Sequence, residues 1–432
     1  MTINDIYKRI ISNFKILGLG KVFAGLCSAL TIFILARHLG VEGFGILAIA
    51  ISIVEVGNVI LSLRVWESST KFLGSFINES EKVSQLLIWS LKLALKSSLA
   101  SNLLICIFSY YFINDLFEID FSISALVLTY SFFYLFNTSN EIMDGFLRTY
   151  NKYLYILINN ITSNLIRLIF IFIIIKTYDD LVILIAGMGT SIIVGFLFRI
   201  FFIKRTFNEK NISLSFGTEK INDYKKEFLG FAVSTHSANM INLANEKNLG
   251  VLLIGYLVGP FYAGLFKAAR SIVKIIRRIM DPLLDIIYPE FISLVNKGRT
   301  KDLKKLIFNS TKILSIISII VGSLIFILSE EIIIIFFGSE YINSAFALNL
   351  LIIAALINNA SYWITPWILA INKPKYLLFI TISVSFAYIL TLYPLIINLE
   401  HIGAAYSGIL RASITLLLGL YFFNKFMNKK TT

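Results

Sequence analysis

The chain consists of long apolar runs separated by short polar segments. A helix that crosses a bilayer needs about 20 mainly apolar residues, so the pattern predicts an all-α integral membrane protein with about twelve membrane-spanning helices. The first six are expected at residues 14–36, 42–63, 91–113, 122–146, 153–176 and 181–203. The second six are expected at residues 229–255, 260–287, 306–329, 344–370, 377–397 and 402–424.

The longest polar stretch divides the predicted spans into six plus six. We expect an N-terminal lobe over 1–203, a cytoplasmic linker over 204–228 and a C-terminal lobe over 229–432. An even number of spans in each half makes the two lobes parallel in the membrane, around a central cavity. A short repeat agrees with this division, because Gly40 and Gly45 after the first span have the same spacing as Gly259 and Gly264 after the seventh. The alternative is that glycine-rich turns are simply common in membrane proteins.

Composition agrees with a lipid environment. The chain is 57% hydrophobic and 15% charged, whereas soluble domains are about 45–50% apolar and about 25% charged. The net charge of +13 is spread over short segments between the spans, which argues against nucleic acid as a partner. Cys27 and Cys106 form no metal or redox motif, and no phosphate-binding glycine loop occurs, so we expect no cofactor and no metal.

The basic segments also predict orientation. They alternate along the chain with acidic turns such as 115–120, 179–180 and 330–331. Because lysine and arginine are enriched in cytoplasmic loops, both termini are expected in the cytoplasm, as in a multi-pass protein of the bacterial inner membrane.

Several charges lie too deep in the predicted spans to be accidental. An ionisable group at the bilayer centre costs about 2.5–3.5 kcal/mol, so it normally faces a cavity or a partner. Glu55, Arg167, Lys274 and Arg411 lie near mid-membrane. Slightly farther out lie Lys21 and Glu246.

The eighth predicted span carries a cationic stripe. Its charged residues step by three and four and so share one helical face: Lys267, Arg270, Lys274, Arg277 and Asp281. Such a face suits a cavity for a phosphate or pyrophosphate. The candidate substrate-binding residues are Lys21, Arg167, Lys267, Arg270, Lys274 and Arg411, and the candidate ion-coupling residues are Glu55 and Glu246. The alternative is that these charges pair with one another inside the protein. No catalytic residue is predicted.

Aromatic and amide side chains give weaker signals. Four tryptophans fall near predicted cytoplasmic span ends, where an interfacial belt is expected: Trp66, Trp89, Trp363 and Trp367. The tenth span offers polar candidates for contact with sugars: Asn358, Asn359, Ser361 and Tyr362.

Four short motifs are spread along the chain. Residues 36–45 (ARHLGVEGFG) are similar to the A-R-x-L-G-x-x-x-[FY]-G segment of the bacterial polysaccharide flippases, and residues 63–72 (LRVWESSTKF) resemble the O-antigen members of that family. Residues 264–269 (GLFKAA) resemble its G-x-[YF]-x-A-A segment, and residues 403–406 (GAAY) its G-A-A segment. The resemblance covers essentially the whole chain. The order and placement of the four motifs make it more specific than any one motif alone.

The resemblance implies the fold of the multidrug/oligosaccharidyl-lipid/polysaccharide exporter superfamily. It also implies a non-enzymatic flippase that moves an undecaprenyl-pyrophosphate-linked repeat unit of O-antigen, lipopolysaccharide or capsule type by ion-coupled alternating access. A polysaccharide polymerase and chain-length proteins are implied partners. The alternatives are a flippase for the peptidoglycan precursor, a cation-coupled drug exporter of the same fold, and a membrane glycan polymerase. The short outward loops weaken the polymerase.

Overall fold

The computed structural model describes residues 3–117, 123–178, 180–241, 248–274, 291, 294–295 and 297–429. Within these ranges all regular secondary structure is helical, which confirms the predicted all-α class. Backbone packing divides the chain into two units. Unit 1 comprises Met1–Leu35 and Ala50–Leu243, and unit 2 comprises Ala36–Ile49 and Ala244–Thr432. The turn after the first predicted span therefore packs with unit 2.

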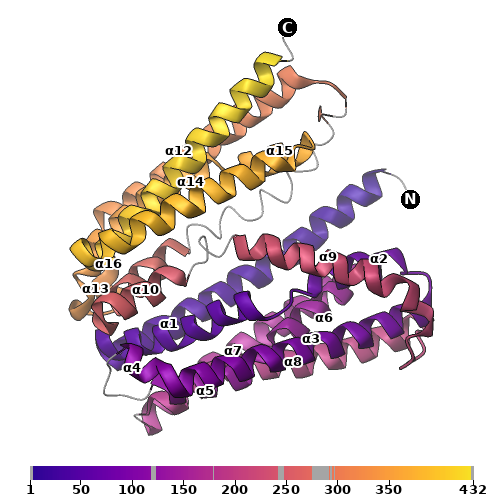
Figure 1. The fold of residues 1–432 in the computed structure, drawn as a ribbon, viewed down its shortest axis with the longest axis horizontal. Helices are drawn as coiled ribbons and strands as arrows, with labels where there is room; N and C mark the ends of the chain where they lie inside the picture. The colour runs from indigo at the N-terminus through magenta and orange to yellow at the C-terminus, as the bar shows by residue number, and fades with distance from the viewer. Residues whose placement is uncertain are drawn as a thin grey trace. The chain divides into compact units, whose positions relative to one another are not determined.

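Unit 1 is built from long helices that run alongside one another (Figure 1). The first helix, α1 (Ile3–Leu61), is interrupted at Gly40, which has a φ of 66°, and both of its ends belong to unit 1 while residues 36–49 belong to unit 2. The others are α2 (Trp66–Ser75), α3 (Ser80–Phe108), α4 (Asn114–Phe117), α5 (Ile123–Tyr134), α6 (Asn137–Thr149), α7 (Tyr153–Thr177), α8 (Leu181–Glu209) and α9 (Asn222–Ile241). A π-helical turn, Ser109–Ile113, follows α3, and a 3₁₀ turn, Glu219–Ile221, precedes α9.

An aromatic core holds α9 against α2 and α3. The fully buried Phe228 of α9 lies 5.6 Å from Phe72 and 4.9 Å from Trp89, measured between ring centroids. Tyr224 lies 4.8 Å from Phe76 in an edge-to-face arrangement. Edge-to-face rings at these separations are favourable beyond the area that they bury. The helix that follows the polar segment, α9, therefore packs within unit 1 against α2 and α3.

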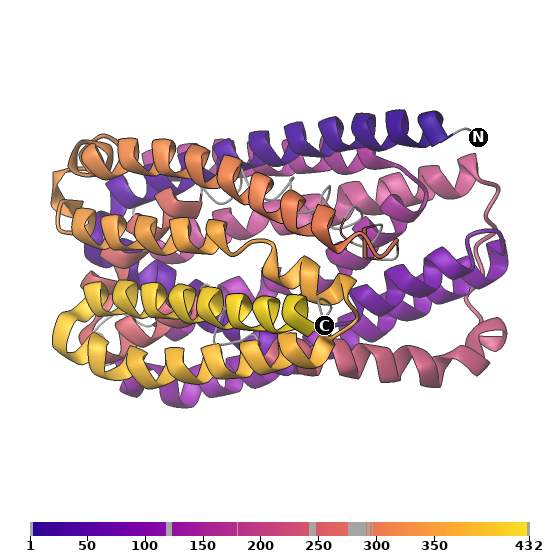
Figure 2. The ribbon, with the colours of Figure 1, turned by 90° about the horizontal axis from the view of Figure 1, so that it is seen from above.

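Unit 2 contains the remaining helices. They are α10 (Leu249–Val258), a helical stretch over 260–274, α12 (Thr300–Ile327), α13 (Ser329–Phe336), a 3₁₀ turn at Ser339–Tyr341, α14 (Ser344–Ala360), α15 (Ile364–Ala370) and α16 (Pro374–Lys429). Figure 2 shows the two halves of α16 side by side and joined at one end. The chain reverses near Glu400, and Tyr376 of the first half stacks on Phe422 of the second at 4.5 Å.

Tryptophans form the core of unit 2. Trp363 is 4% exposed and Trp367 is 0% exposed, and both lie 5.1 Å from the ring of Phe423. These two residues therefore pack inside unit 2 rather than on its outer surface, and their level at a span end stays a prediction. Lipid tails are as apolar as a protein core, so the position of a tryptophan near a span end does not show which environment it enters.

Seven helical segments in the described ranges are long and apolar enough to cross a membrane. Two of them, Phe23–Leu61 and Lys375–Met427, are 39 and 53 residues long. Each contains a break, and each covers two predicted spans. The remaining predicted spans coincide with shorter or interrupted helices: α5 with α6, α9 with α10, and 260–274. The helices thus agree with a twelve-span plan.

Candidate functional site

Two predicted mid-membrane charges of unit 1 meet at one tyrosine. The hydroxyl of Tyr130, on α5, donates a hydrogen bond to Glu55 of α1, and Arg167 of α7 acts on the same hydroxyl electrostatically. Tyr130 is 8% exposed. Nη2 of Arg167 donates to Oδ1 of Asn164 at 2.8 Å. The deep carboxylate and the deep guanidinium therefore share one polar cluster, which keeps either charge from facing lipid alone.

A second cluster lies in unit 2, where two predicted arginines approach Tyr388 of α16. The guanidinium carbon of Arg411 lies 5.9 Å from the Tyr388 ring centroid. Arg270 lies 5.7 Å from the Phe266 ring centroid, and both arginines act electrostatically on the Tyr388 hydroxyl. That hydroxyl lies against α10, 3.5 Å from where a Cβ on Gly250 would be.

The chemistry of this second cluster suits an anion. Two guanidinium groups, which only donate, and a phenol hydroxyl, which can donate or accept, bring positive charge to one region, and Tyr388 is 9% exposed. Guanidinium groups bind phosphate oxygens through paired, charge-assisted hydrogen bonds. The sequence alone did not indicate Tyr388, because one tyrosine among 20 has no distinguishing pattern.

The other predicted residues are placed only in part. Lys267 is partly buried and Lys274 is exposed, and both lie on the same helical stretch as Arg270. Lys21 lies in α1, but its side chain is outside the description. Glu246 lies outside the described residues, and so do Arg277 and Asp281. The four polar candidates of the tenth span have local partners: Asn359 donates to Ser318 at 3.0 Å, and Tyr362 contacts Ser310 at 2.5 Å.

The glycine repeat of the sequence forms a backbone contact within unit 2. A Cβ on Gly45 would lie 1.8 Å from the carbonyl oxygen of Pro260, and a Cβ on Gly264 would lie 2.1 Å from that of Val41. Gly45 thus contacts the turn that contains Gly264, and Gly264 contacts the turn that contains Gly45. Gly40 and Gly259, the first glycine of each turn, have φ values of 66° and 97°. Glycine is required here both for close approach and for the left-handed backbone.

The turn over 36–49 is also fastened by side chains. The hydroxyl of Tyr341 donates to the carbonyl oxygens of Ala36 at 2.9 Å and of Gly40 at 2.7 Å. Nη2 of Arg37 donates to the carbonyl oxygen of Ile335 at 2.5 Å, in the last turn of α13. A cation is favourable at a helix C-terminus, where carbonyl groups lack partners within the helix. The arginine of the ARxLG motif therefore caps a helix of unit 2.

A buried ion pair that the sequence did not single out joins α6 and α8. Arg199 is 8% exposed, and its Nε and Nη2 atoms donate to the two carboxylate oxygens of Asp144 at 2.7 and 2.9 Å. Breaking a buried pair from one side costs about 3–5 kcal/mol, because the remaining charge keeps its burial and loses its partner.

We expect Asp144→Asn to lower the thermal midpoint of the purified protein markedly. The matched control is Asp302→Asn, since Asp302 accepts from Arg299 at the same 2.7 Å but the two side chains are 47% and 58% exposed. An exposed pair contributes about 0–1 kcal/mol, so the control is expected to change little. Equal shifts in the two variants would show that burial does not determine the strength of the Asp144 pair.

A second polar group ties α2 to α9 in unit 1. Arg64 donates to Glu67 from Nε and to Oδ1 of Asn239 from Nη1, the latter at 2.5 Å. Within the described ranges, Oε2 of Glu67 is buried without a hydrogen-bond partner. Burial raises the pKa of Glu67 above its usual 4.5, and the charge of Arg64 only partly opposes this.

The raised pKa of Glu67 predicts a pH dependence of stability. Its contribution is fully present below pH 4.5, where the folded protein holds the proton, and is lost as the pH rises through the raised folded pKa. We expect Glu67→Gln to remove this contribution, so that the thermal midpoint of the variant gains on the wild type as the pH rises above 4.5. Thermal unfolding at a series of pH values measures the difference. A difference that is constant with pH would contradict the raised pKa.

Comparison with known proteins adds the following. The model of a family described as "Polysaccharide biosynthesis protein" matches residues 10–295. An inward-facing multidrug resistance MATE family transporter of the MOP superfamily is 15% identical, with a TM-score of 0.74 over 92% of this chain and 96% of that one. The lipid II flippase MurJ, in an inward closed conformation, is 17% identical, with a TM-score of 0.74 over 94% of this chain and 87% of that one. A MOP superfamily transporter from Pyrococcus furiosus is 14% identical, with a TM-score of 0.60 over 95% of each chain.

Identities this low show the fold alone. The fold is that of a multi-pass membrane transporter of the MATE and MurJ type, as the sequence predicts. A comparison with curated protein sequences gives no match.

Proposed function

Since the chain belongs to the family of polysaccharide biosynthesis proteins, we propose that it is a flippase for a lipid-linked oligosaccharide. The substrate is an undecaprenyl-pyrophosphate-linked repeat unit of O-antigen or capsule type, which passes from the cytoplasmic to the outer leaflet of the bacterial inner membrane. The flippase whose structure is similar carries another lipid-linked precursor, lipid II. The similar solved structures named above are transporters and a flippase, which supports transport without covalent chemistry.

The observation that carries this proposal is the pair of arginines at Tyr388. A pyrophosphate diester carries two negative charges, which must be compensated while the head group crosses the low-dielectric region. Arg411 lies 5.9 Å from the Tyr388 ring centroid, and Arg270, on a different helix, acts electrostatically on the same buried hydroxyl. An exporter of organic cations would instead favour an acidic lining, so this cluster favours the lipid-linked anion over a drug.

Ion coupling is assigned in this proposal to Glu55. A carboxylate held by a tyrosine hydroxyl near a guanidinium exchanges a proton or a small cation when the local charge balance changes. Glu246 stays a prediction from its depth in the seventh span. Similar transporters solved in inward-facing and outward-facing conformations support alternating access, with the head group moving through the protein while the polyprenyl chain stays in the bilayer.

The decisive experiment is deletion of the gene in a bacterium that carries its surface-polysaccharide locus, followed by complementation. Surface glycan and the sidedness of the lipid-linked repeat unit are measured together, with a membrane-impermeant sugar oxidant on spheroplasts. The proposal expects loss of surface glycan and repeat units confined to the cytoplasmic leaflet. Unpolymerised repeat units in the outer leaflet would instead identify a polymerase. Retention of lipid II inside, with lysis, would identify a peptidoglycan precursor flippase.

A further inference from the structure

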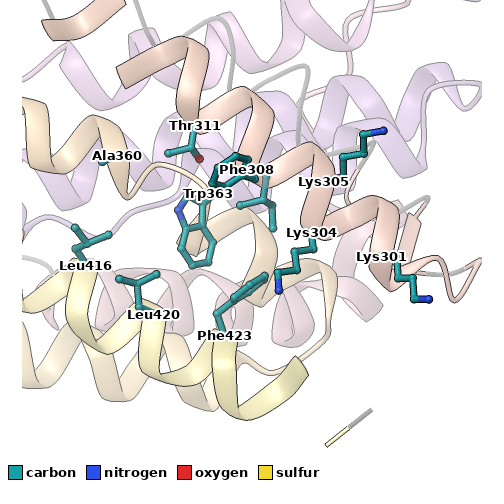
Figure 3. A pocket seen from close by; sticks show the side chains of 11 residues that line it. Lys301, Lys304, Lys305, Phe308, Thr311, Ala360, Trp363, Leu416, Leu420 and Phe423 are labelled. Atoms are coloured by element: carbon teal, nitrogen blue, oxygen red, sulfur yellow. The ribbon is translucent and has the colours of Figure 1, made fainter. Parts of the chain in front are cut away.

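An apolar cavity with a basic rim lies within unit 2, apart from the cluster at Tyr388. Its volume is about 530 Å³, within the usual range for small-ligand sites. It is bounded by α12, by the α14–α15 junction and by the second half of α16 (Figure 3). Nothing in the transport scheme above uses it.

The wall of the cavity is aromatic and aliphatic. The Trp363 indole is 4% exposed and lies 5.1 Å from the Phe423 ring, which fixes its position. Leu416 and Leu420 line the side formed by α16. On α12, Phe308 is 68% exposed, so the apolar lining continues to the outer surface of the helix. This lining suits a hydrocarbon chain.

Three lysines occupy the end of α12 that borders the same cavity: Lys301, Lys304 and Lys305. In Figure 3 the Lys304 side chain extends toward the Phe423 ring. Among the described residues none of the three has a carboxylate within ion-pair distance, and the neighbouring Asp302 pairs with Arg299 at 2.7 Å. The local positive charge is therefore not neutralised by the described part of the chain.

Along α12, the cationic and apolar residues that line the cavity follow the same order as the head group and acyl chain of a lipid. The lysines lie in its first two turns, at the end predicted to be cytoplasmic, and the helix then continues as a membrane-spanning candidate. From Lys304 to Thr311, both of which line the cavity, the helix rises by about 10 Å. Cations thus lie at the level of head groups and the aromatic wall at the level of the upper acyl chain. A soluble anion needs no such wall, and a neutral lipid needs no such cations.

We propose that this cavity is a binding site for an anionic phospholipid of the cytoplasmic leaflet. Its phosphate is held by Lys304, with Lys301 and Lys305 adding positive charge at the same end of α12, and one acyl chain lies against Trp363 and Phe423. Basic pockets between membrane helices on the cytoplasmic side are known to select anionic head groups. The site is separate from the proposed transport path and does not depend on the identity of the transported sugar.

The test uses the full-length protein in phosphatidylcholine nanodiscs that contain brominated phosphatidylglycerol, because bromine quenches a tryptophan that it contacts. We expect brominated phosphatidylglycerol to quench more strongly than brominated phosphatidylcholine at the same mole fraction. The excess is expected to vanish in Trp363→Phe, which identifies the cavity as its origin. Equal quenching by the two lipids overturns the proposal.

Charge variants separate the site from general attraction to a negative surface. Lys301→Gln/Lys304→Gln/Lys305→Gln is expected to weaken the phosphatidylglycerol preference by about tenfold or more, since each lysine near an anionic surface contributes roughly fivefold. The matched control Lys204→Gln/Lys210→Gln/Lys226→Gln removes the same charge from exposed positions of unit 1 and is expected to keep the preference. An equal loss in the control overturns the site.

Two competitors and one steric variant complete the test. Displacement by inorganic phosphate would show a soluble-anion site, and displacement by one equivalent of undecaprenyl phosphate would show a site for the transported lipid; either result overturns the proposal. Leu420→Phe narrows the cavity without changing charge or adding a tryptophan, and is expected to reduce the excess quenching strongly. It and the single variant Lys304→Gln retain the test if the triple variant does not fold.

Discussion

Gly264→Ala is expected to lower the stability of the protein strongly, because the added methyl group has no room. The new Cβ would lie 2.1 Å from the carbonyl oxygen of Val41 and 3.2 Å from the amide nitrogen of Gly45. These are backbone atoms, so no flexible side chain can move aside. Overpacking typically costs about 1–3 kcal/mol, and we expect a cost of about 3 kcal/mol or more at this position.

The measurement is the thermal midpoint of purified protein, together with the yield of monodisperse material. Gly45→Ala is expected to act similarly, because its Cβ would meet the Pro260 carbonyl oxygen at 1.8 Å. The double variant is expected to cost less than the sum, since both changes disrupt one contact.

Gly230→Ala is the matched control for both glycine variants. It lies inside α9 with no atom within 4 Å of the added Cβ. Alanine favours a helix over glycine by about 0.5–1 kcal/mol, so this variant is expected to be neutral or stabilised. If Gly264→Ala unfolds at the same temperature as Gly230→Ala, the backbone contact between the two turns does not exist in the protein.

Arg270→Gln and Arg411→Gln are each expected to reduce transport about 10- to 100-fold. A hydrogen bond between an ionised donor and an ionised acceptor contributes about 1.5–3 kcal/mol, and glutamine removes the charge while keeping a polar side chain. The initial rate at which a labelled undecaprenyl-pyrophosphate sugar crosses the bilayer of proteoliposomes measures the effect. Thermal unfolding of the same preparations separates loss of transport from loss of folding.

Three further variants sharpen the interpretation. Arg411→Lys keeps the charge and is expected to retain part of the rate, whereas Tyr388→Phe keeps the ring under Arg411 and removes only the hydroxyl. Arg205→Gln removes an exposed arginine that pairs with Glu209 at 3.0 Å and is expected to transport normally. Wild-type rates in well-folded Arg270→Gln and Arg411→Gln would assign both arginines a structural role and remove the main support for the proposed function.

Much of the fold follows from local properties of the chain. In lipid, each backbone polar group must be satisfied within its own segment, so long apolar runs determine helices. The lengths of those runs also identified the spans on either side of the breaks at Gly40 and near Glu400. Glycine spacing marked the two turns that meet through Gly45 and Gly264, although only the structure shows that they contact each other.

The candidate site is less accessible to such reasoning. Depth along a span singled out Glu55, Arg167 and Arg411, because charge in lipid is costly wherever it occurs. Depth does not show which partner a charge takes. The partners are Tyr130 and Tyr388, and both lie far in the sequence from at least one of the charges that act on them. For the same reason the sequence did not indicate that Asp144 and Arg199 form an ion pair.

The sequence by itself determined the helical class and the approximate spans, since both depend on local stretches of about 20 residues, whereas the depth of the ionisable residues stays a prediction from the cost of charge in lipid. Only the tertiary structure decided that Trp363 and Trp367 are buried, that residues 36–49 pack with unit 2, and that Arg270 and Arg411 approach one tyrosine. The physical reason is that lipid and protein interior are equally apolar. Hydrophobicity therefore fixes how deep a residue lies in the membrane, whereas packing between helices decides what it faces.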